Sequence, residues 1–303
     1  MSMSTLDLVK SCSITDYKPV VREKATPSWE WEQLFTVGNT NRAQEKFYKI
    51  AGLPQAQPRG ELQAVPFYDF EELGDSTLTI SKDMVGVRIS REAMLDNQHI
   101  PALVRELGTM TKESLQYAID LRAAEPFIYA FDSATFPMFD STAMCANTHT
   151  LTDNSNYDNL ETAATPDYDS VWSTLETYRW NLVAHNGLPM LNDDIASVVF
   201  HDSMITTWRK ILENPDEPDT SDRNTSFVAK KKIKQVVCPH LTSTDDYFYL
   251  GKRAKKEFVW LWRERSGTDE EEDKQIQGMM FMGWHRSGLC VKDYLFVIGN
   301  AGS

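Results

Sequence analysis

The chain has 303 residues, of which 41% are hydrophobic and 25% are charged, an ordinary composition for a globular protein. At this length it can bury about 75% of its unfolded surface, enough for one large domain or two interleaved ones. The net charge of −13 disfavours a reader of nucleic acid, although it does not exclude a container that holds DNA without adhering to it. No run of about 18 apolar residues predicts a membrane span and no basic-then-apolar leader opens the chain, so we expect production in the cytosol.

The first 45 or so residues are polar and mixed, but they contain Trp29 and Trp31. Frayed termini are common, yet they seldom carry two tryptophans. We therefore interpret this region as an extended arm that docks on the rest of the molecule, with a short helix around residues 42–50.

Residues 65–89 have the pattern of a long β-hairpin. A first arm at 65–73 is followed by turn-forming Gly74 and Asp75, and apolar residues alternate along a return arm at 78–89. A two-stranded ribbon is marginal alone in water, so it needs another surface to lie on. That surface is either the rest of its own domain or a neighbouring copy of the chain. The side chains expected to contact a neighbour are Phe67, Phe70, Leu73, Leu78, Ile80, Val85, Val87 and Ile89.

One long amphipathic helix is predicted over about residues 100–125. Pro101 suits its first turn, and Pro126 is expected to end or kink it. Apolar residues recur at a spacing of four and three along one face. The large side chains of this face are Leu103, Leu107, Met110, Tyr117 and Leu121. The helix would be about 37 Å long, which suits a strut.

The rest of the chain alternates loops, two shorter helices and strands. A helix is expected after Asp167, ending near Gly187, and another between residues 202 and 215 with a buried strand at 195–200 before it. Five further strands are predicted at residues 233–238, 247–250, 258–262, 279–284 and 294–298. The acidic run at 269–273 is interpreted as a solvated loop, because clustered like charges repel.

No common catalytic motif occurs, whether of the phosphate-loop, dinucleotide, zinc-protease or hydrolase-elbow type. The sequence therefore predicts no catalytic, cofactor-binding or metal-binding residue. The alternative from another class is a metal-dependent hydrolase that uses Asp193, Asp194 and His201.

Cysteines and lysines allow further alternatives. Four widely spaced cysteines in a cytosolic chain favour buried thiols; a zinc site that joins Cys145 and His149 to Cys238 and His240 is the remote alternative. The lysine cluster at residues 230–234 fits either an edge strand protected from aggregation or a contact with acidic neighbours or nucleic acid.

Three segments carry a resemblance to a known family. They are Ile-Ser-Arg-Glu-Ala-Met at residues 89–94, Met-Phe-Asp-Ser-Thr-Ala at 138–143 with His149 nearby, and Cys-Pro-His-Leu-Thr at 238–242 followed by Tyr-Phe-Tyr-Leu at 247–250. In order and spacing they resemble the major capsid proteins of tailed double-stranded DNA bacteriophages with the Hong Kong 97-type fold, and among these the Mu-like major head subunit group.

The resemblance implies an α+β fold with four parts. These are an N-terminal arm at 1–51, an extended loop at 52–92, a peripheral domain at 93–164 and 276–303 that holds the long spine helix, and an axial domain at 165–275.

The resemblance also implies a structural role without enzymatic activity or a cofactor. Such subunits form hexamers and pentamers that tile an icosahedral shell around double-stranded DNA in the virion, after synthesis and assembly in the host cytoplasm. No long N-terminal scaffolding segment is present, so a separate scaffolding protein is expected, with a portal and a decoration protein as further partners. The alternative within this fold is a non-viral compartment that encloses a protein cargo.

Overall fold

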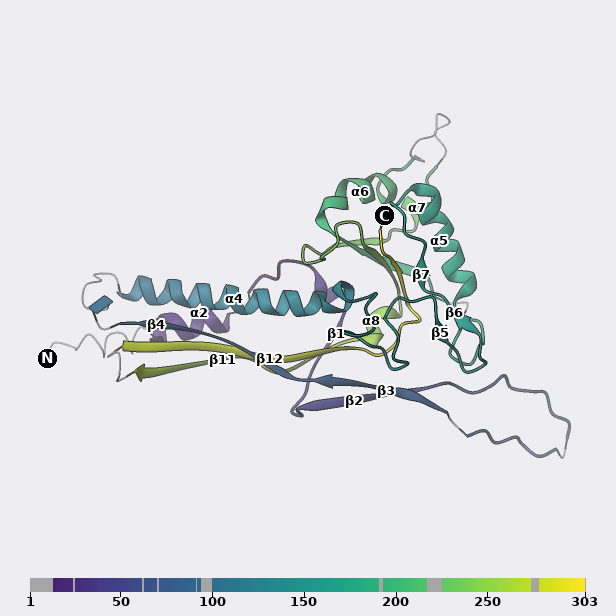
Figure 1. Cartoon of the computed structure of the whole chain (residues 1–303), viewed down its shortest axis with the longest axis horizontal. Helices are drawn as coiled ribbons and strands as arrows, with labels where there is room; N and C mark the ends of the chain where they lie inside the picture. The colour runs from purple at the N-terminus through teal and green to yellow at the C-terminus, as the bar shows by residue number, and fades with distance from the viewer. Residues whose placement is uncertain are drawn as a thin grey trace.

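The computed structural model describes residues 13–23, 25–61, 63–69, 71–90, 92–93, 100–190, 193–216, 225–273 and 278–302. An elongated arm joins a wedge-shaped body, and a two-stranded ribbon runs below the body into a long loop that projects on the side away from the arm (Figure 1). Within the described ranges, no helix is both long enough and apolar enough to cross a lipid bilayer.

The elongated arm consists of the long helix α4 (Ile100–Ile128) packed on a four-stranded sheet (Figure 1). The helix confirms the predicted element, although it continues through Pro126 for two more residues. The sheet has the order β1-β11-β12-β4, in which β12 is antiparallel to both neighbours and β1 is parallel to β11. Its strands are β1 (Thr36–Asn39), β11 (Phe258–Asp273), β12 (Gly278–Val291) and β4 (Ser81–Ile89).

The face of α4 that packs on the sheet is not the stripe of large apolar residues. Along most of the helix the buried stripe is displaced by about one residue from it, and it comprises Ile100, Val104, Gly108, Thr111, Leu115, Ile119 and Ala123; Asp120, Ala124, Pro126 and Phe127 are buried as well near the C-terminal end. One residue corresponds to a rotation of about 100°. The small residues Gly108 and Thr111 lie where the N-terminal segment crosses the helix, since a Cβ at Gly108 would be 3.3 Å from the carbonyl oxygen of Tyr17. A pattern that counts large apolar residues overlooks such a contact.

The N-terminal segment docks on the arm, as the two tryptophans predicted. It contains η1 (Ser13–Tyr17), α2 (Lys18–Arg22) and η2 (Trp31–Gln33). Trp29 and Trp31 are 4% and 2% exposed, and the ring of Trp31 lies 4.7 Å from that of Trp260 on β11. Residues 44–50 form a strand, so the expected short helix is wrong.

The body is built on a five-stranded sheet of order β7-β13-β10-β8-β9 (Figure 1). Its strands are β7 (Leu160–Glu161), β13 (Val297–Asn300), β10 (Tyr247–Gly251), β8 (Ile195–Phe200) and β9 (Lys234–Val237). The helical elements around this sheet are α5 (Tyr168–Asn181), η3 (Asp202–Met204), α6 (Ile205–Leu212), α7 (Phe227–Lys230) and α8 (Ala254–Glu257). A small ribbon joins β5 (His149–Thr150) to β6 (Asn156–Tyr157). Asp167 caps α5 by accepting a hydrogen bond from the amide of Ser170, at 2.6 Å.

The predicted hairpin is wrong in its pairing. Strand β3 (Glu72–Thr79) pairs with β2 (Gln44–Ile50), while β4 pairs with β12 in the arm. The expected turn residues Gly74 and Asp75 lie within β3, opposite Lys49 and Tyr48. Local turn chemistry favoured a short hairpin, but β4 buries its apolar face against α4 and the distant strand β12.

The two sheets also divide the chain differently from the expected domains. Strand β11 lies in the arm although the expected boundary at residue 275 would assign it to the body, and β13 lies in the body although residues 276–303 were expected beside the spine. The acidic run at 269–272 pairs with β12, so it is strand and not loop. Its charges reach water at the sheet edge, where Lys18 and Glu270 form a 3.1 Å ion pair.

Candidate interaction surfaces

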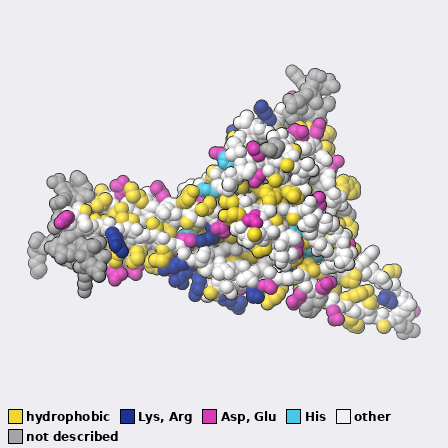
Figure 2. All heavy atoms as spheres, in the orientation of Figure 1, with side chains coloured by type: hydrophobic (Ala, Val, Ile, Leu, Met, Phe, Trp, Pro, Cys, Tyr) yellow, Lys and Arg dark blue, Asp and Glu magenta, His cyan; other side chains and the backbone are white. Residues whose placement is uncertain are grey.

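The loop between β2 and β3 is the most exposed apolar feature of the chain. From residue 52 to 69, every described residue other than Pro66 is exposed. Phe67 is 95% exposed, Val65 67% and Leu53 62%. Figure 2 shows hydrophobic side chains on this loop, beyond the main mass of the molecule. Large apolar side chains held in water at one site indicate an interaction surface.

The structure separates the hairpin residues that were expected to contact a neighbour. Phe67 lies on the exposed loop and Leu73 is half-buried on β3, whereas Phe70 lies outside the described residues. Leu78 is fully buried against Val259 and Cys290 of the same chain, with Ile80 packed beside them.

The return arm is also covered by its own chain. Ile89 is 6% exposed and lies in the cluster beneath α4, with Val85 packed against it. Val87 is half-buried on the same strand. For these residues the cover is therefore intramolecular: Leu78 and Ile80 pack on β11 and β12, and Val85 and Ile89 lie on β4, which is part of the arm sheet.

Exposed residues in β2 and its loop were missed by the sequence reasoning. Tyr48 and Ile50 are 62% and 50% exposed, and they alternate with the inward residues Phe47 and Lys49. The alternation is one of burial only: in the sequence the apolar residues of 44–50 stand at 47, 48 and 50, so no period-two signal for a strand was available.

The outer face of α4 is a second uncovered apolar surface. Met110, Tyr117 and Leu121, which belong to the predicted apolar stripe, are 53%, 59% and 40% exposed. Leu103 and Leu107 lie at the margin and pack partly on the cluster beneath the helix. The predicted stripe is therefore the solvent side of the spine.

A polar group lies between α4 and the sheet. Arg122 donates to Asp83 at 2.7 Å and to the hydroxyl of Ser287 at 3.1 Å. His285 is 1% exposed, and its Nε2 lies 3.4 Å from Asp83. Burial lowers the pKa of His285 and nearby Arg122 lowers it further, against the opposing charge of Asp83. The imidazole is thus held neutral beneath the helix.

The residues of the hydrolase alternative do not meet. Asp193 accepts from the Tyr178 hydroxyl at 2.8 Å, and Asp194 pairs with Lys252 at 3.1 Å. His201 follows β8 while the two aspartates precede it, so the length of a six-residue strand, about 20 Å, separates them. No cluster of three or more potential metal ligands occurs among the residues that the structure describes.

The cysteines are packing residues where they are described. Cys145, Cys238 and Cys290 are buried free thiols. Burial raises the pKa of Cys145 and raises that of Cys238 to about 12, so neither of the two candidate ligands is a ready thiolate for zinc at neutral pH. His149 instead contacts Asp140 at 2.6 Å and stacks on Tyr294, with ring centroids 3.6 Å apart.

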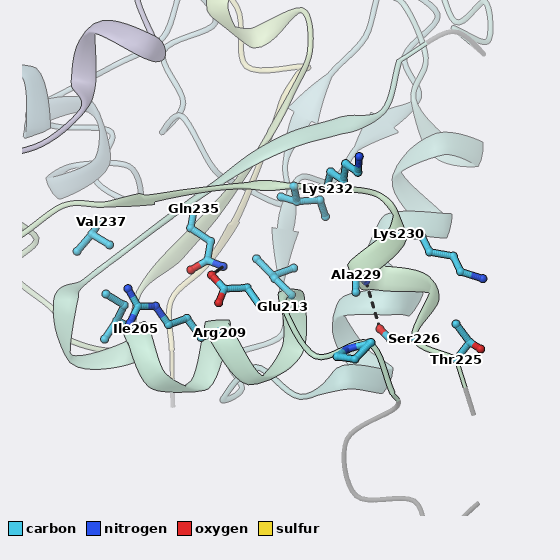
Figure 3. A pocket seen from close by; sticks show the side chains of 13 residues that line it. Ile205, Arg209, Glu213, Thr225, Ser226, Ala229, Lys230, Lys232, Gln235 and Val237 are labelled. Carbon is cyan, nitrogen blue, oxygen red and sulfur yellow. Dashed lines mark hydrogen bonds between the residues drawn. The ribbon is translucent and has the colours of Figure 1, made fainter. Parts of the chain in front are cut away.

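The lysine cluster borders an open groove of about 750 Å³ between α6, α7 and β9 (Figure 3). Lys230 ends α7 and Lys232 lies in the left-handed region at φ 52°, so the lysines do not lie together on one face of a strand. Strand β9 is the last in its sheet, which agrees with the interpretation of a lysine-protected edge. Glu213 bridges the groove by accepting from Gln235 at 3.1 Å.

Comparison with solved structures identifies the fold. The chain has the α+β fold of phage capsid proteins, which confirms the fold class that the sequence resemblance implied. No protein-family model and no curated protein matches the sequence.

Three solved structures illustrate the likeness. The capsid of the cyanophage P-SCSP1u has 13% identity over 93% of this chain and 91% of that one, with a TM-score of 0.57. The capsid of an empty GTA particle has 13% identity over 93% and 92%, with a TM-score of 0.58. A structure of Mycobacterium phage Adephagia has 10% identity over 95% and 94%, with a TM-score of 0.56.

Proposed function

We propose that this chain is the major capsid protein of a tailed double-stranded DNA bacteriophage. The observation that carries the proposal is a capsid fold that extends over at least nine-tenths of this chain and of its structural neighbours. As such a subunit it forms hexamers and pentamers that close into an icosahedral shell around DNA. Its place is the shell of the virion, and it is made and assembled in the host cytoplasm.

In this proposal the elongated arm, formed by α4 and the four-stranded sheet, is the peripheral domain, and α4 is its spine helix. The body built on the five-stranded sheet is the axial domain. The extended loop is the ribbon of β2 and β3 with its tip, residues 44–79, a segment shifted toward the N-terminus from the expected 52–92. The docked segment before residue 40 is the N-terminal arm.

The loop tip supplies the proposed contact between subunits. Its apolar side chains have no cover in their own chain, and the outer face of α4 exposes apolar side chains of similar kind. Burying a side chain such as that of Phe67 stabilises a contact by about 1.5–3 kcal/mol. Each contact is head to tail and closes into a ring, and the repetition of weak contacts makes the shell stable.

The net charge of −13 supports the role of a container. An acidic wall does not release counterions from DNA, so packaged DNA is confined without adhering. A scaffolding protein, a portal and a decoration protein are the partners that we propose for assembly, and the groove of Figure 3 has no assigned role among them.

Electron microscopy of the purified chain tests the proposal. We expect closed shells, alone or with a co-expressed scaffolding protein. A chain that stays monomeric at high concentration in both cases would contradict it. The contents of particles from the native source separate this function from a protein-cargo compartment: nuclease-protected DNA supports the phage shell, and a packaged enzyme supports the compartment.

A further inference from the structure

The ribbon of β2 and β3 is fastened to the body by a buried ionic contact. Lys49, on the inward side of β2, forms an ion pair with Asp293, which precedes β13. Lys49 also lies 3.9 Å from Glu257. The side chain of Asp293 is 1% exposed, whereas that of Lys49 is 22% exposed. The ribbon therefore contributes the ammonium group of Lys49 to an acidic site that Asp293 and Glu257 of the body form.

Asp293 is held from the other side by the body. Nε2 of His185 lies 3.2 Å from both carboxylate oxygens, and the amide of Leu295 donates to one of them at 3.2 Å. The ring of His185 packs edge-on against Phe139 and Tyr294, with centroids 5.5 Å apart in each case. The body therefore fixes the position of the Asp293 carboxylate independently of Lys49.

The next contact marks the end of the fastened region. Asn186, adjacent to His185, donates from Nδ2 to the carbonyl oxygen of Leu53 at 2.7 Å. The backbone bends there, because Gly52 has φ +93°. Beyond it, the described residues from 54 to 69 are exposed apart from Pro66. The ionic contact and this hydrogen bond are therefore the last supports before the free loop.

We infer that Lys49, Asp293 and His185 act together as an anchor that sets the direction in which the loop at residues 54–69 leaves the body. A two-stranded ribbon has little rigidity of its own. A buried ion pair contributes little net stability but enforces one geometry, because any other arrangement leaves a charge unpaired. The loop extends about 25 Å if its two sides run back to back. A rotation of 10° at the anchor would then move the far end of the loop by about 4 Å, and each apolar side chain along the loop in proportion to its distance from the anchor.

This inference deepens the proposed function and rests on it, since the anchor would position the subunit contact. The test compares Lys49→Met with a matched control, Lys46→Met. Lys46 lies on the same strand, but its partner is Asp75 on β3, at 3.3 Å, so its loss leaves the attachment to the body intact. Lys49→Arg keeps the charge and serves as the conservative variant.

Two measurements are made on each variant: amide hydrogen exchange of the unassembled subunit, and shell yield by sedimentation. For Lys49→Met we expect exchange in residues 44–53 and 72–79 to rise tenfold or more, with α4 unchanged, and shell yield to fall at least tenfold. Lys46→Met should change both by less than twofold, and Lys49→Arg should recover most of the yield.

Two results would overturn the anchor. One is wild-type exchange and wild-type yield in Lys49→Met. The other is an equal loss of protection in α4, which would make the contact a general support of the fold. If the wild-type chain forms no shells at all, the proposed function fails, and the exchange comparison still decides whether the anchor holds the ribbon.

Discussion

Asp120 joins the N-terminal segment to the spine helix through several hydrogen bonds. Its carboxylate accepts from the amide of Ser28 at 2.7 Å, the indole of Trp31 at 3.1 Å and the side-chain amide of Gln116 at 2.7 Å. The indole of Trp29 donates to its backbone carbonyl at 3.2 Å. Asp120 is 1% exposed. Its carboxylate can be buried because hydrogen bonds from the surrounding donors replace those that water would make.

Asp120→Ala should destabilise the chain by about 1–3 kcal/mol, because it leaves the buried indole of Trp31 without its acceptor and removes the hydrogen bond from the amide of Ser28. Limited proteolysis should then cut before residue 35 while α4 stays protected. Gln116→Ala is the control, since it removes one donor and leaves the carboxylate paired with the others. Equal urea midpoints for Asp120→Ala and the wild-type chain would contradict this role.

At the scale of the element, α4 has two faces with separate tasks. Leu115 is 7% exposed beneath the helix, whereas Tyr117 is 59% exposed on its outer side. Leu115→Ala should cost about 2–4 kcal/mol of folding free energy through lost burial and a cavity. Tyr117→Ser should change it far less, by about 0.5 kcal/mol, because the mostly exposed ring loses only its edge-on contact with His240, at 5.3 Å between ring centroids.

Shell yield provides the second readout for this pair. If the outer face takes part in assembly, Tyr117→Ser lowers the yield although its unfolding curve matches that of the wild-type chain. An unchanged yield would remove the outer face of α4 from the proposed contacts.

His285 makes the junction between α4 and the sheet sensitive to acid. Its pKa in the folded chain is depressed, chiefly by burial, while in the unfolded chain it is about 6.5. Below that pH the unfolded chain binds the proton more readily, so stability is complete above pH 6.5 and falls as the pH drops toward the folded pKa. Unfolding free energies from pH 8 to 5 should fall less steeply for His285→Gln than for the wild-type chain. Parallel curves would contradict the neutral buried imidazole.

The elements themselves were largely predictable, and their partners were not. The spine helix and strand β8 follow from apolar periodicity, and Asp167 marked the start of α5. The predicted hairpin pairing was wrong because Gly74 and Asp75 carry a local turn signal, while the partner of β4 lies about 200 residues away in β12. The packed face of α4 could not be identified from apolar periodicity, because Gly108 and Thr111 carry no hydrophobic signal and are buried by the N-terminal segment that crosses the helix.

At the scale of the whole molecule, the structure restricts where the loop can be removed. Replacing residues 54–69 with a short Gly-Ser linker leaves β2, β3 and the anchor in place. The free energy of unfolding of the subunit should therefore change by less than about 0.5 kcal/mol. Shell formation should be lost, because the exposed apolar tip is gone. A loop-shortened chain that forms normal shells would show that the tip is not the subunit contact.

The fold class came from the order of three weak sequence segments, which single residues could not supply. The described residues of the segments 89–94, 138–143 and 238–250 lie in different parts of the arm and body, and only the spacing of these segments in the sequence indicated one architecture. The candidate contact was predicted in part: Phe67 belongs to the exposed tip, but Leu53, Val65 and Tyr68 were missed, and Val85 and Ile89 are internal. The alternation of apolar residues along one strand does not reveal that a strand distant in the sequence covers them.

A cryo-electron microscopy reconstruction of the assembled particle would show whether the loop at residues 54–69 contacts another subunit. We predict that Phe67 and Val65, exposed by 95% and 67% in the single chain, become buried against another copy of the chain at every position in the shell. A particle in which the tip of the loop stays in solvent, or folds back on its own subunit, would contradict the account.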